Sequence, residues 1–234
     1  MDRNHYSHGR VGCGASLYHL RMVAPQTSPE THSNINPTKG HDGNGIYGGS
    51  FNPIHRGHVE LAERLCRDEG LDELWFMVSP QNPFKKSSPD LLDENSRLEL
   101  ARMAVREHPC LKVSDFEFRL RPSPYTADTL AALRQAYPDR LFTLVIGADN
   151  WLAFKDWKKP DEILSHHRIL VYPRPGYPVQ TASLPSGVRL TETPLIDISS
   201  TELRRLISQG EDASYGLDEA VWQEIRKRGY YRKA

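Results

Sequence analysis

Two histidines stand in a short glycine-rich segment, GGSFNPIHRGH, at residues 48–58. His55 and His58 are separated by two residues, so both side chains could face the same anion at the start of a helix. Glycines let a phosphate approach the backbone closely, and the free amides of a helix start attract anions. The segment therefore indicates phosphate binding, although a turn followed by a capped helix would use the same residues.

A second candidate anion site lies near the end of the chain, in the sequence ISSTELR at residues 198–204. Ser199 and Ser200 offer side-chain oxygens that cap a helix, and its first turn exposes N–H groups at the positive end of the helix dipole. Arg204 follows Ser200 by four residues. Its side chain could fold back over the helix start and donate hydrogen bonds to phosphate oxygens. An ordinary capped helix without a ligand would account for the same pattern.

One further glycine pattern is set aside. Residues 43–48, GNGIYG, satisfy the GxGxxG pattern of dinucleotide-binding folds. That pattern requires a strand before it and a helix directly after it, whereas turn-forming residues precede it here and the helix starts later. We therefore expect no dinucleotide site of that type.

These segments need elements that bring distant parts of the chain together, and the apolar pattern predicts them. Strands are expected at 46–47, 72–79, 111–120, 141–146 and 168–172, and helices at 57–69, 93–107, 127–137, 161–166, 200–209 and 217–228. Such alternation is typical of an α/β fold, an open parallel sheet with helices on both faces. The apolar run at 141–146 indicates a central strand. The GGSFNPIHRGH segment follows the first strand, where parallel sheets bind ligands.

Composition excludes several classes of protein. The chain has 234 residues, with 30 Lys and Arg against 30 Asp and Glu. With no net charge, it has no general attraction to nucleic acid or to an anionic membrane. The longest apolar run is far shorter than the roughly 20 residues that a membrane span needs. The three cysteines are widely spaced and predict neither a disulfide framework nor a zinc site, so we expect a protein of the reducing cytoplasm.

The first 44 residues differ from the rest, because they lack apolar periodicity and hold five of the ten histidines. Such a stretch cannot bury enough apolar surface to order itself. We expect a disordered extension, or a gene start placed too early, followed by a single domain at 45–234.

From Gly45 onward the chain resembles the bacterial nicotinate-nucleotide adenylyltransferases of the HxGH nucleotidyltransferase superfamily. GGSFNPIHRGH is similar to their first motif and ISSTELR to their last. Three more resemblances lie between these two in the expected order: PQNPFK at 80–85, SPYTADTL at 123–130, and GADNW at 147–151 followed by Trp157. The resemblance implies a Rossmann-like nucleotidyltransferase fold.

The same resemblance implies a reaction, the transfer of AMP from ATP to nicotinate mononucleotide with release of pyrophosphate. Because the attacking phosphate is already an anion, the site needs charge neutralisation and in-line positioning more than a general base. By resemblance, His55 and His58 are the catalytic residues. ATP would be held by Gly48, Gly49, Ser50, Phe51, His55, His58, Ser199, Ser200 and Arg204. Magnesium would arrive with ATP, and no protein residue is expected to ligate it.

The acceptor nucleotide would be bound, by resemblance, by Asn52, Lys85, Tyr125, Thr126, Asp149, Trp157 and Lys158. Tyr125 and Trp157 could stack on the aromatic base, and the backbone N–H groups of Thr126 and Lys158 could hold its carboxylate. Asp149 suits ribose hydroxyls. The two aromatic residues could instead pack in the core, and Lys85 could be either a phosphate ligand or a solvated charge. The sequence offers no obvious acidic partner for an amide, which favours the acid nucleotide.

Some positions depart from the family pattern. Pro124 interrupts the usual Ser-Tyr-Thr and removes a backbone donor, Phe84 precedes Lys85 where a histidine is common, and the first strand is polar before Ile46. Two other hypotheses are a different adenylyltransferase of the superfamily, for phosphopantetheine or nicotinamide mononucleotide, and a nucleotide-binding regulatory module without turnover. The sequence leaves open whether the chain forms a homo-oligomer.

Overall fold

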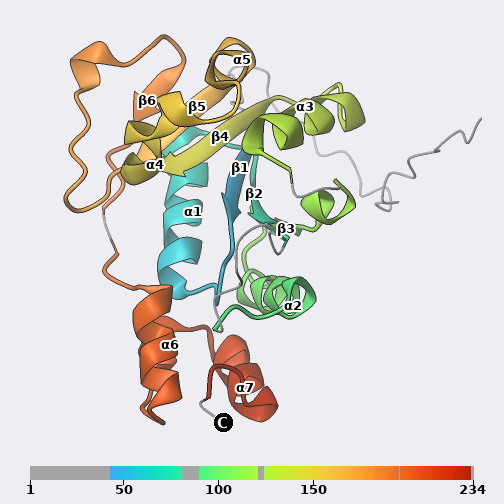
Figure 1. The fold of residues 1–234 in the computed structure, drawn as a ribbon, viewed down its shortest axis with the longest axis vertical. Coiled ribbons are helices and arrows are strands. Elements are labelled where there is room, and N and C mark those ends of the chain that lie inside the picture. The colour runs from blue at the N-terminus through green and yellow to red at the C-terminus, as the bar shows by residue number, and fades with distance from the viewer. Residues whose placement is uncertain (1–42, 81–89, 121–123, 195, 233–234) are drawn as a thin grey trace, which may run out of the picture. The chain divides into compact units, whose positions relative to one another are not determined.

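The computed structural model describes residues 43–80, 90–120, 124–194 and 196–232 (Figure 1). Its strands are β1 (Asn44–Gly49), β2 (Glu73–Val78), β3 (Leu111–Ser114), β4 (Phe142–Gly147), β5 (Arg168–Tyr172) and β6 (Val188–Leu190). Its α-helices are α1 (Arg56–Glu69), α2 (Glu94–Ala104), α3 (Thr126–Ala136), α4 (Ala148–Leu152), α5 (Pro160–His166), α6 (Ser200–Ser208) and α7 (Glu219–Arg228). Short 3-10 helices occupy Phe116–Arg119, Phe154–Asp156, Thr181–Ser183 and Ser214–Gly216.

All six strands are parallel and lie in the order β3-β2-β1-β4-β5-β6. Ile46 is in register with Trp75 of β2 on one side and with Leu144 of β4 on the other. The strands β2 and β3, which follow β1 in sequence, are added on one side of it, and the strands β5 and β6, which follow β4, are added on the opposite side. The direction in which strands are added therefore reverses between these two central strands. The crevice beyond their carboxyl ends is where open α/β sheets bind ligands.

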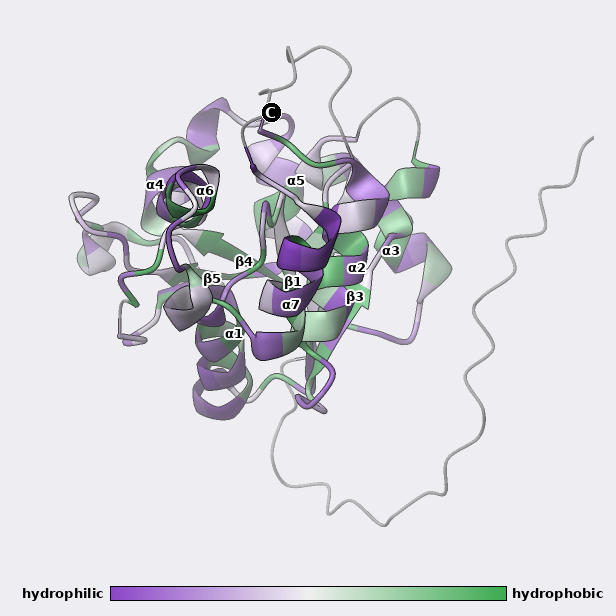
Figure 2. Cartoon of the chain, turned by 90° about the horizontal axis from the view of Figure 1, so that it is seen from below, coloured by the Kyte–Doolittle hydropathy of each residue, from purple (hydrophilic) through white to green (hydrophobic). Residues whose placement is uncertain are grey.

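Alternate strand residues build two hydrophobic cores, one on each face of the sheet. Tyr47 and Val145 belong to the core shared with α1, α2, α6 and α7, whereas Ile46, Leu144 and Ile146 belong to the core shared with α3 and α5. The period of two residues on each strand causes this division. In Figure 2 the strands are mostly green, whereas α1 is largely purple. The predicted α/β fold, with helices on both faces of an open parallel sheet, is confirmed.

The predicted helices are all present, with ends that differ by up to three residues. The strand expected through 111–120 was wrong in its second half: β3 stops at Ser114, and Phe116–Arg119 form a 3-10 helix. The Ser114 hydroxyl accepts the Phe116 N–H at 3.2 Å, which turns the chain out of the sheet. The edge strand β6 and the short helix α4 were not predicted.

The rejected GNGIYG pattern lies mostly within β1 itself, so it cannot follow a strand as a dinucleotide fingerprint must. Among the described residues, no helix is long and apolar enough to cross a bilayer. Residues 1–42 lie outside the described residues, and the disordered extension expected there stays a prediction.

Candidate active site

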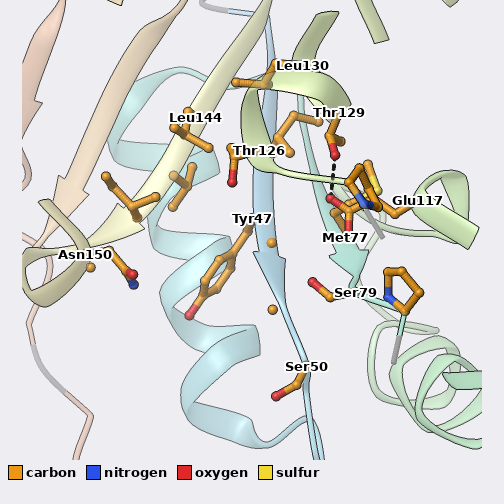
Figure 3. Close-up of a pocket in the computed structure, with 18 of the residues that line it drawn as sticks. Tyr47, Ser50, Met77, Ser79, Glu117, Thr126, Thr129, Leu130, Leu144 and Asn150 are labelled. Atoms are coloured by element: carbon orange, nitrogen blue, oxygen red, sulfur yellow. Dashed lines mark hydrogen bonds between the residues drawn. The ribbon is translucent and has the colours of Figure 1, made fainter. Parts of the chain in front are cut away.

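A cavity of about 780 Å³ opens at the carboxyl ends of β1, β2 and β4. Figure 3 shows Ser50 at one end of it, on the loop that follows β1, and Thr126 and Leu130 of α3 at the other. A Cβ atom added to Gly48, which lines this cavity, would meet no atom within 4 Å. The backbone therefore leaves open space at Gly48, as a close-lying phosphate requires.

Glu117 is a cavity residue that the sequence analysis missed. It is 9 % exposed, lines the same cavity, and its Oε1 accepts a hydrogen bond from the Thr129 hydroxyl at 2.7 Å (Figure 3). Burial raises the pKa of this carboxyl. The sequence analysis named no acidic partner for an amide, and the structure places one carboxyl, that of Glu117, in the wall of this cavity. A lone acid between Phe116 and Phe118 could have drawn attention, because a charge flanked by apolar residues needs a buried partner.

His55 and His58 form a reciprocal cap at the start of α1. The Nδ1 of His55 accepts the His58 N–H, and the Nδ1 of His58 accepts the His55 N–H, each at 3.3 Å. The two rings stack with centroids 3.6 Å apart. A neutral imidazole whose Nδ1 accepts a hydrogen bond carries its proton on Nε2. Both rings are therefore left with an Nε2–H donor, and the helix cap is part of the site rather than an alternative to it.

The electrostatics of the pair favour the neutral form. Burial lowers the pKa of His55 to about 4, and burial and the neighbouring His55 lower the pKa of His58 well below its usual value. Arg174 disfavours a positive charge on both rings. The pair therefore offers hydrogen-bond donors without a fixed charge near neutral pH.

A second cavity, of about 710 Å³, lies beside this histidine pair. It is lined by both histidines, by the segment that follows β5, and by the start of α6. Tyr47 and Tyr172 line both cavities, and their hydroxyls are 3.2 Å apart. The two cavities therefore meet at this pair of tyrosines, an arrangement suited to two substrates that react with each other.

Comparison of the sequence with known proteins identifies the family of this chain. Residues 46–206 match the cytidylyltransferase-like family. A protein of Bacteroides fragilis described as a probable nicotinate-nucleotide adenylyltransferase is 49 % identical over 181 residues, which cover 77 % of this chain and 90 % of the relative. A relative with the same description from Cytophaga hutchinsonii is 40 % identical over 187 residues, 80 % of this chain and 97 % of its own. The chain belongs to the nicotinate-nucleotide adenylyltransferase family.

Solved structures show the same fold at low identity. The nicotinic acid mononucleotide adenylyltransferase of Plasmodium falciparum, complexed with NaAD, superposes with a TM-score of 0.69 and 18 % identity. The match covers 82 % of this chain and 98 % of that one. This chain therefore has the same Rossmann-like nucleotidyltransferase fold as that structure.

Most of the residues that the adenylyltransferase resemblance pointed to line one of the two cavities. Gly48, Gly49, Ser50, Asn52, Thr126, Trp157 and Arg204 line the first cavity, and His55, His58, Ser199 and Ser200 line the second. Arg204 was expected beside Ser199 and Ser200, but it lines the other cavity. Its Nη1 donates to the Asn52 carbonyl at 2.7 Å, which turns the guanidinium toward the loop after β1. The Ser200 hydroxyl donates to the Pro53 carbonyl at 3.0 Å, so α6 is fixed to the same loop.

Four of the predicted residues line neither cavity: Phe51, Tyr125, Asp149 and Lys158. Phe51 is buried against the rings of Tyr47 and Phe76. Tyr125 is 61 % exposed, and the Lys158 ammonium lies 4.7 Å from its ring centroid. Lys158 also pairs with Asp128 at 3.0 Å. Of the two predicted stacking residues, only Trp157 therefore faces the cavity.

Asp149, the residue predicted to bind ribose hydroxyls, lies beside Arg174. The Asp149 Oδ1 is buried, accepts no hydrogen bond from the described residues, and lies 3.5 Å from the Arg174 Nε. Asp149 is thus engaged by Arg174, and it is next in sequence to Asn150, which lines the first cavity. Lys85 lies outside the described residues, so its role stays a prediction.

Proposed function

We propose that this protein transfers AMP from ATP to nicotinate mononucleotide, forming nicotinate adenine dinucleotide and pyrophosphate in NAD biosynthesis. The observation that carries the proposal is the pair of cavities that meet at Tyr47 and Tyr172, with two neutral histidines at one of them. One cavity would take ATP and the other the mononucleotide. The two reacting phosphates would then meet at the junction of the cavities.

In this reaction the 5′-phosphate of the mononucleotide attacks the α-phosphorus of ATP, and the bond to the pyrophosphate breaks. The Nε2–H groups of His55 and His58 would donate hydrogen bonds to the ATP phosphates as their charge redistributes. Ser199, Ser200 and the start of α6 would hold the departing phosphates, since free helix N–H groups bind anions. Because the nucleophile is already ionised, no proton needs to be removed from it.

On the acceptor side, Trp157 would stack on the nicotinate ring and the Thr126 N–H would donate to its carboxylate. Gly48, Gly49, Ser50 and Arg204 were assigned to ATP by resemblance. Because they line the same cavity as Trp157 and Thr126, we assign them instead to the phosphate of the acceptor, with Arg204 as a cation beside it. The Glu117 Oε1 is already bonded to Thr129, so we assign this carboxyl to holding α3 rather than to the ligand. This assignment keeps the preference for the acid nucleotide.

Magnesium fits the proposal as an ion that arrives on the phosphates of ATP. Within the described residues, no group of three or more His, Cys, Asp or Glu could hold a metal ion. Mg²⁺ keeps much of its water and is commonly bound through substrate phosphates. It would neutralise the pyrophosphate as that group leaves.

We also propose that the protein acts in the cytoplasm on these small molecules, without nucleic-acid or membrane partners. Cys66 and Cys110 are free thiols, which suits a reducing compartment, and the balanced charge gives no general affinity for polyanions.

Pyrophosphate release tests this function directly. The full chain is supplied with ATP and Mg²⁺ and with either nicotinate or nicotinamide mononucleotide. We expect kcat/KM to be at least about tenfold higher for the acid form, since one charge-assisted hydrogen bond is worth roughly 1.5 to 3 kcal/mol. Equal use of the two forms would contradict the acid preference. No release with either would indicate a binding module without turnover.

Matched histidine variants locate the chemistry in the same assay. His58→Ala should lower kcat on the order of 10² to 10³-fold, comparable to the loss of one preorganised donor. His108→Ala removes a ring that pairs with Glu63 at 2.6 Å, outside both cavities, and should leave kcat unchanged. Similar kcat values for the two variants would count against the assigned role of the histidine pair.

A further inference from the structure

The Asn52 side chain is a junction between three distant parts of the chain. Its Nδ2 donates to the Asp90 carbonyl at 2.8 Å, and its Oδ1 accepts the Leu92 N–H at 3.2 Å. The same Oδ1 accepts the phenolic hydroxyl of Tyr231 at 2.8 Å. Asn52 is 6 % exposed, and its amide is largely occupied by protein partners. It therefore fixes the loop between β1 and α1 rather than presenting a free amide to a ligand.

Two arginines hold the backbone of the same region. Arg97 on α2 is 1 % exposed and donates to the Ser50 carbonyl at 2.6 Å, the Ser79 carbonyl at 2.9 Å and the Leu92 carbonyl at 2.9 Å. Arg204 donates to the Asn52 carbonyl at 2.7 Å. The loop after β1 is thus restrained through its backbone by α2 and α6, and through its side chain by Tyr231.

Tyr231 has a strained backbone conformation. Its φ of 64° lies in the left-handed region, which is unfavourable for a residue other than glycine. Such a conformation persists where surrounding contacts determine it. The neighbouring Tyr230 contacts the Ser96 hydroxyl at 3.0 Å, so two consecutive phenols dock on different targets. Only the second one reaches the loop that lines the cavity.

We propose that Tyr231 is a positioning residue for adenylyl transfer, acting through Asn52 on residues 48–53. The proposal rests on the function proposed above. The phenol does not line the first cavity or the histidine cavity. Its hydroxyl fixes the orientation of the Asn52 side chain, and Asn52 in turn fixes the position of the loop. Gly48, Gly49 and Ser50 of this loop would lie against the acceptor phosphate. In-line attack tolerates little displacement, so a looser loop lowers turnover.

The adjacent tyrosines provide a matched pair of variants. Tyr231→Phe and Tyr230→Phe each remove one phenolic hydroxyl from the same short segment. At saturating ATP and nicotinate mononucleotide, Tyr231→Phe should lower kcat by about threefold to tenfold, the effect of one hydrogen bond. Tyr230→Phe should leave kcat within about twofold. In an Asn52→Ala background, Tyr231→Phe should have no further effect, because the two residues act as one unit.

Amide hydrogen exchange gives a second readout that needs no substrate. The amides of residues 50–52 should exchange faster in Tyr231→Phe than in the parent chain, and at the parent rate in Tyr230→Phe. Equal exchange and equal kcat for the two variants, or additive effects with Asn52→Ala, would overturn the proposal. If the parent chain released no pyrophosphate, the proposed function would fail, and exchange alone would decide whether Tyr231 positions the loop.

Discussion

The charge state of His55 and His58 follows from how their ring nitrogens are used. Each Nδ1 accepts a backbone N–H of the other residue, and the stacked rings would repel each other if both were protonated. The same two bonds that begin α1 therefore select the neutral tautomer with Nε2–H. Under the proposed function, phosphate charge would be neutralised through dipoles and through Arg204 rather than through imidazolium ions.

This charge state makes folding sensitive to acid in a defined range. Between pH 6.5 and about 4, the unfolded chain binds a proton at His55 that the folded chain does not bind. Stability therefore falls as pH decreases through this window, on the order of 3 kcal/mol for a shift of that size. His55→Asn keeps a capping oxygen and removes the titration. Urea unfolding from pH 7 to 4.5 should show a shallower loss of stability in the variant, and parallel curves would contradict the assignment.

At the scale of elements, the start of α1 shows why the segment needs a glycine. A Cβ atom on Gly57 would lie 3.0 Å from the Nδ1 of His55 and 3.1 Å from its Cε1. Both distances are tighter than ordinary contacts, and the His55 ring is confined by its stack on His58. Gly57 therefore allows the two rings to lie against the helix that they cap.

The Gly57→Ala substitution should lower activity while leaving thermal stability nearly unchanged. Alanine favours helix formation by roughly 0.5 to 1 kcal/mol over glycine, which offsets part of the strain of displacing His55. We expect kcat to fall at least about tenfold, with a thermal midpoint within about 4 °C of the parent chain. Glu60→Ala on the same helix is the control and should change neither. Full activity in Gly57→Ala would show that the ring position is not critical.

The elements could be predicted largely from sequence because each depends on local periodicity. The apolar stripe of 57–69 and the run at 141–146 identify α1 and β4 directly. The contacts that complete the site could not be predicted in this way. Glu117 meets Thr129, which lies 12 residues later, and Arg97 meets the Ser50 carbonyl 47 residues away. Such pairings depend on tertiary packing, which leaves no periodic signal in a single sequence.

At the scale of the molecule, both cores and both cavities are lined, in the described part of the chain, by residues from Ile46 onward. The strand order places β1 next to β2 and β4, so the first described strand is also a central one. The reacting groups therefore gather around an element close to the beginning of the described chain.

A chain that begins at Lys39 should consequently fold and catalyse like the full protein. We expect a thermal midpoint within about 4 °C, equivalent to less than roughly 1 to 2 kcal/mol for a domain of this size, and unchanged kcat and KM. Differential scanning calorimetry and steady-state pyrophosphate release compare the two lengths. A larger drop in midpoint would mean that the first residues dock on the domain and belong to its native start.

The bond between Tyr231 and Asn52 joins residues that are 179 positions apart. During translation the loop after β1 emerges first, and its partner is synthesised 179 residues later. At roughly 5 to 20 residues per second, the nascent chain waits on the order of ten seconds or more before this bond can form. Earlier strands can pair in that interval, yet the loop is fully restrained only once Tyr231 has been made. The loop thus acquires its final geometry well after the strand that carries it has been synthesised.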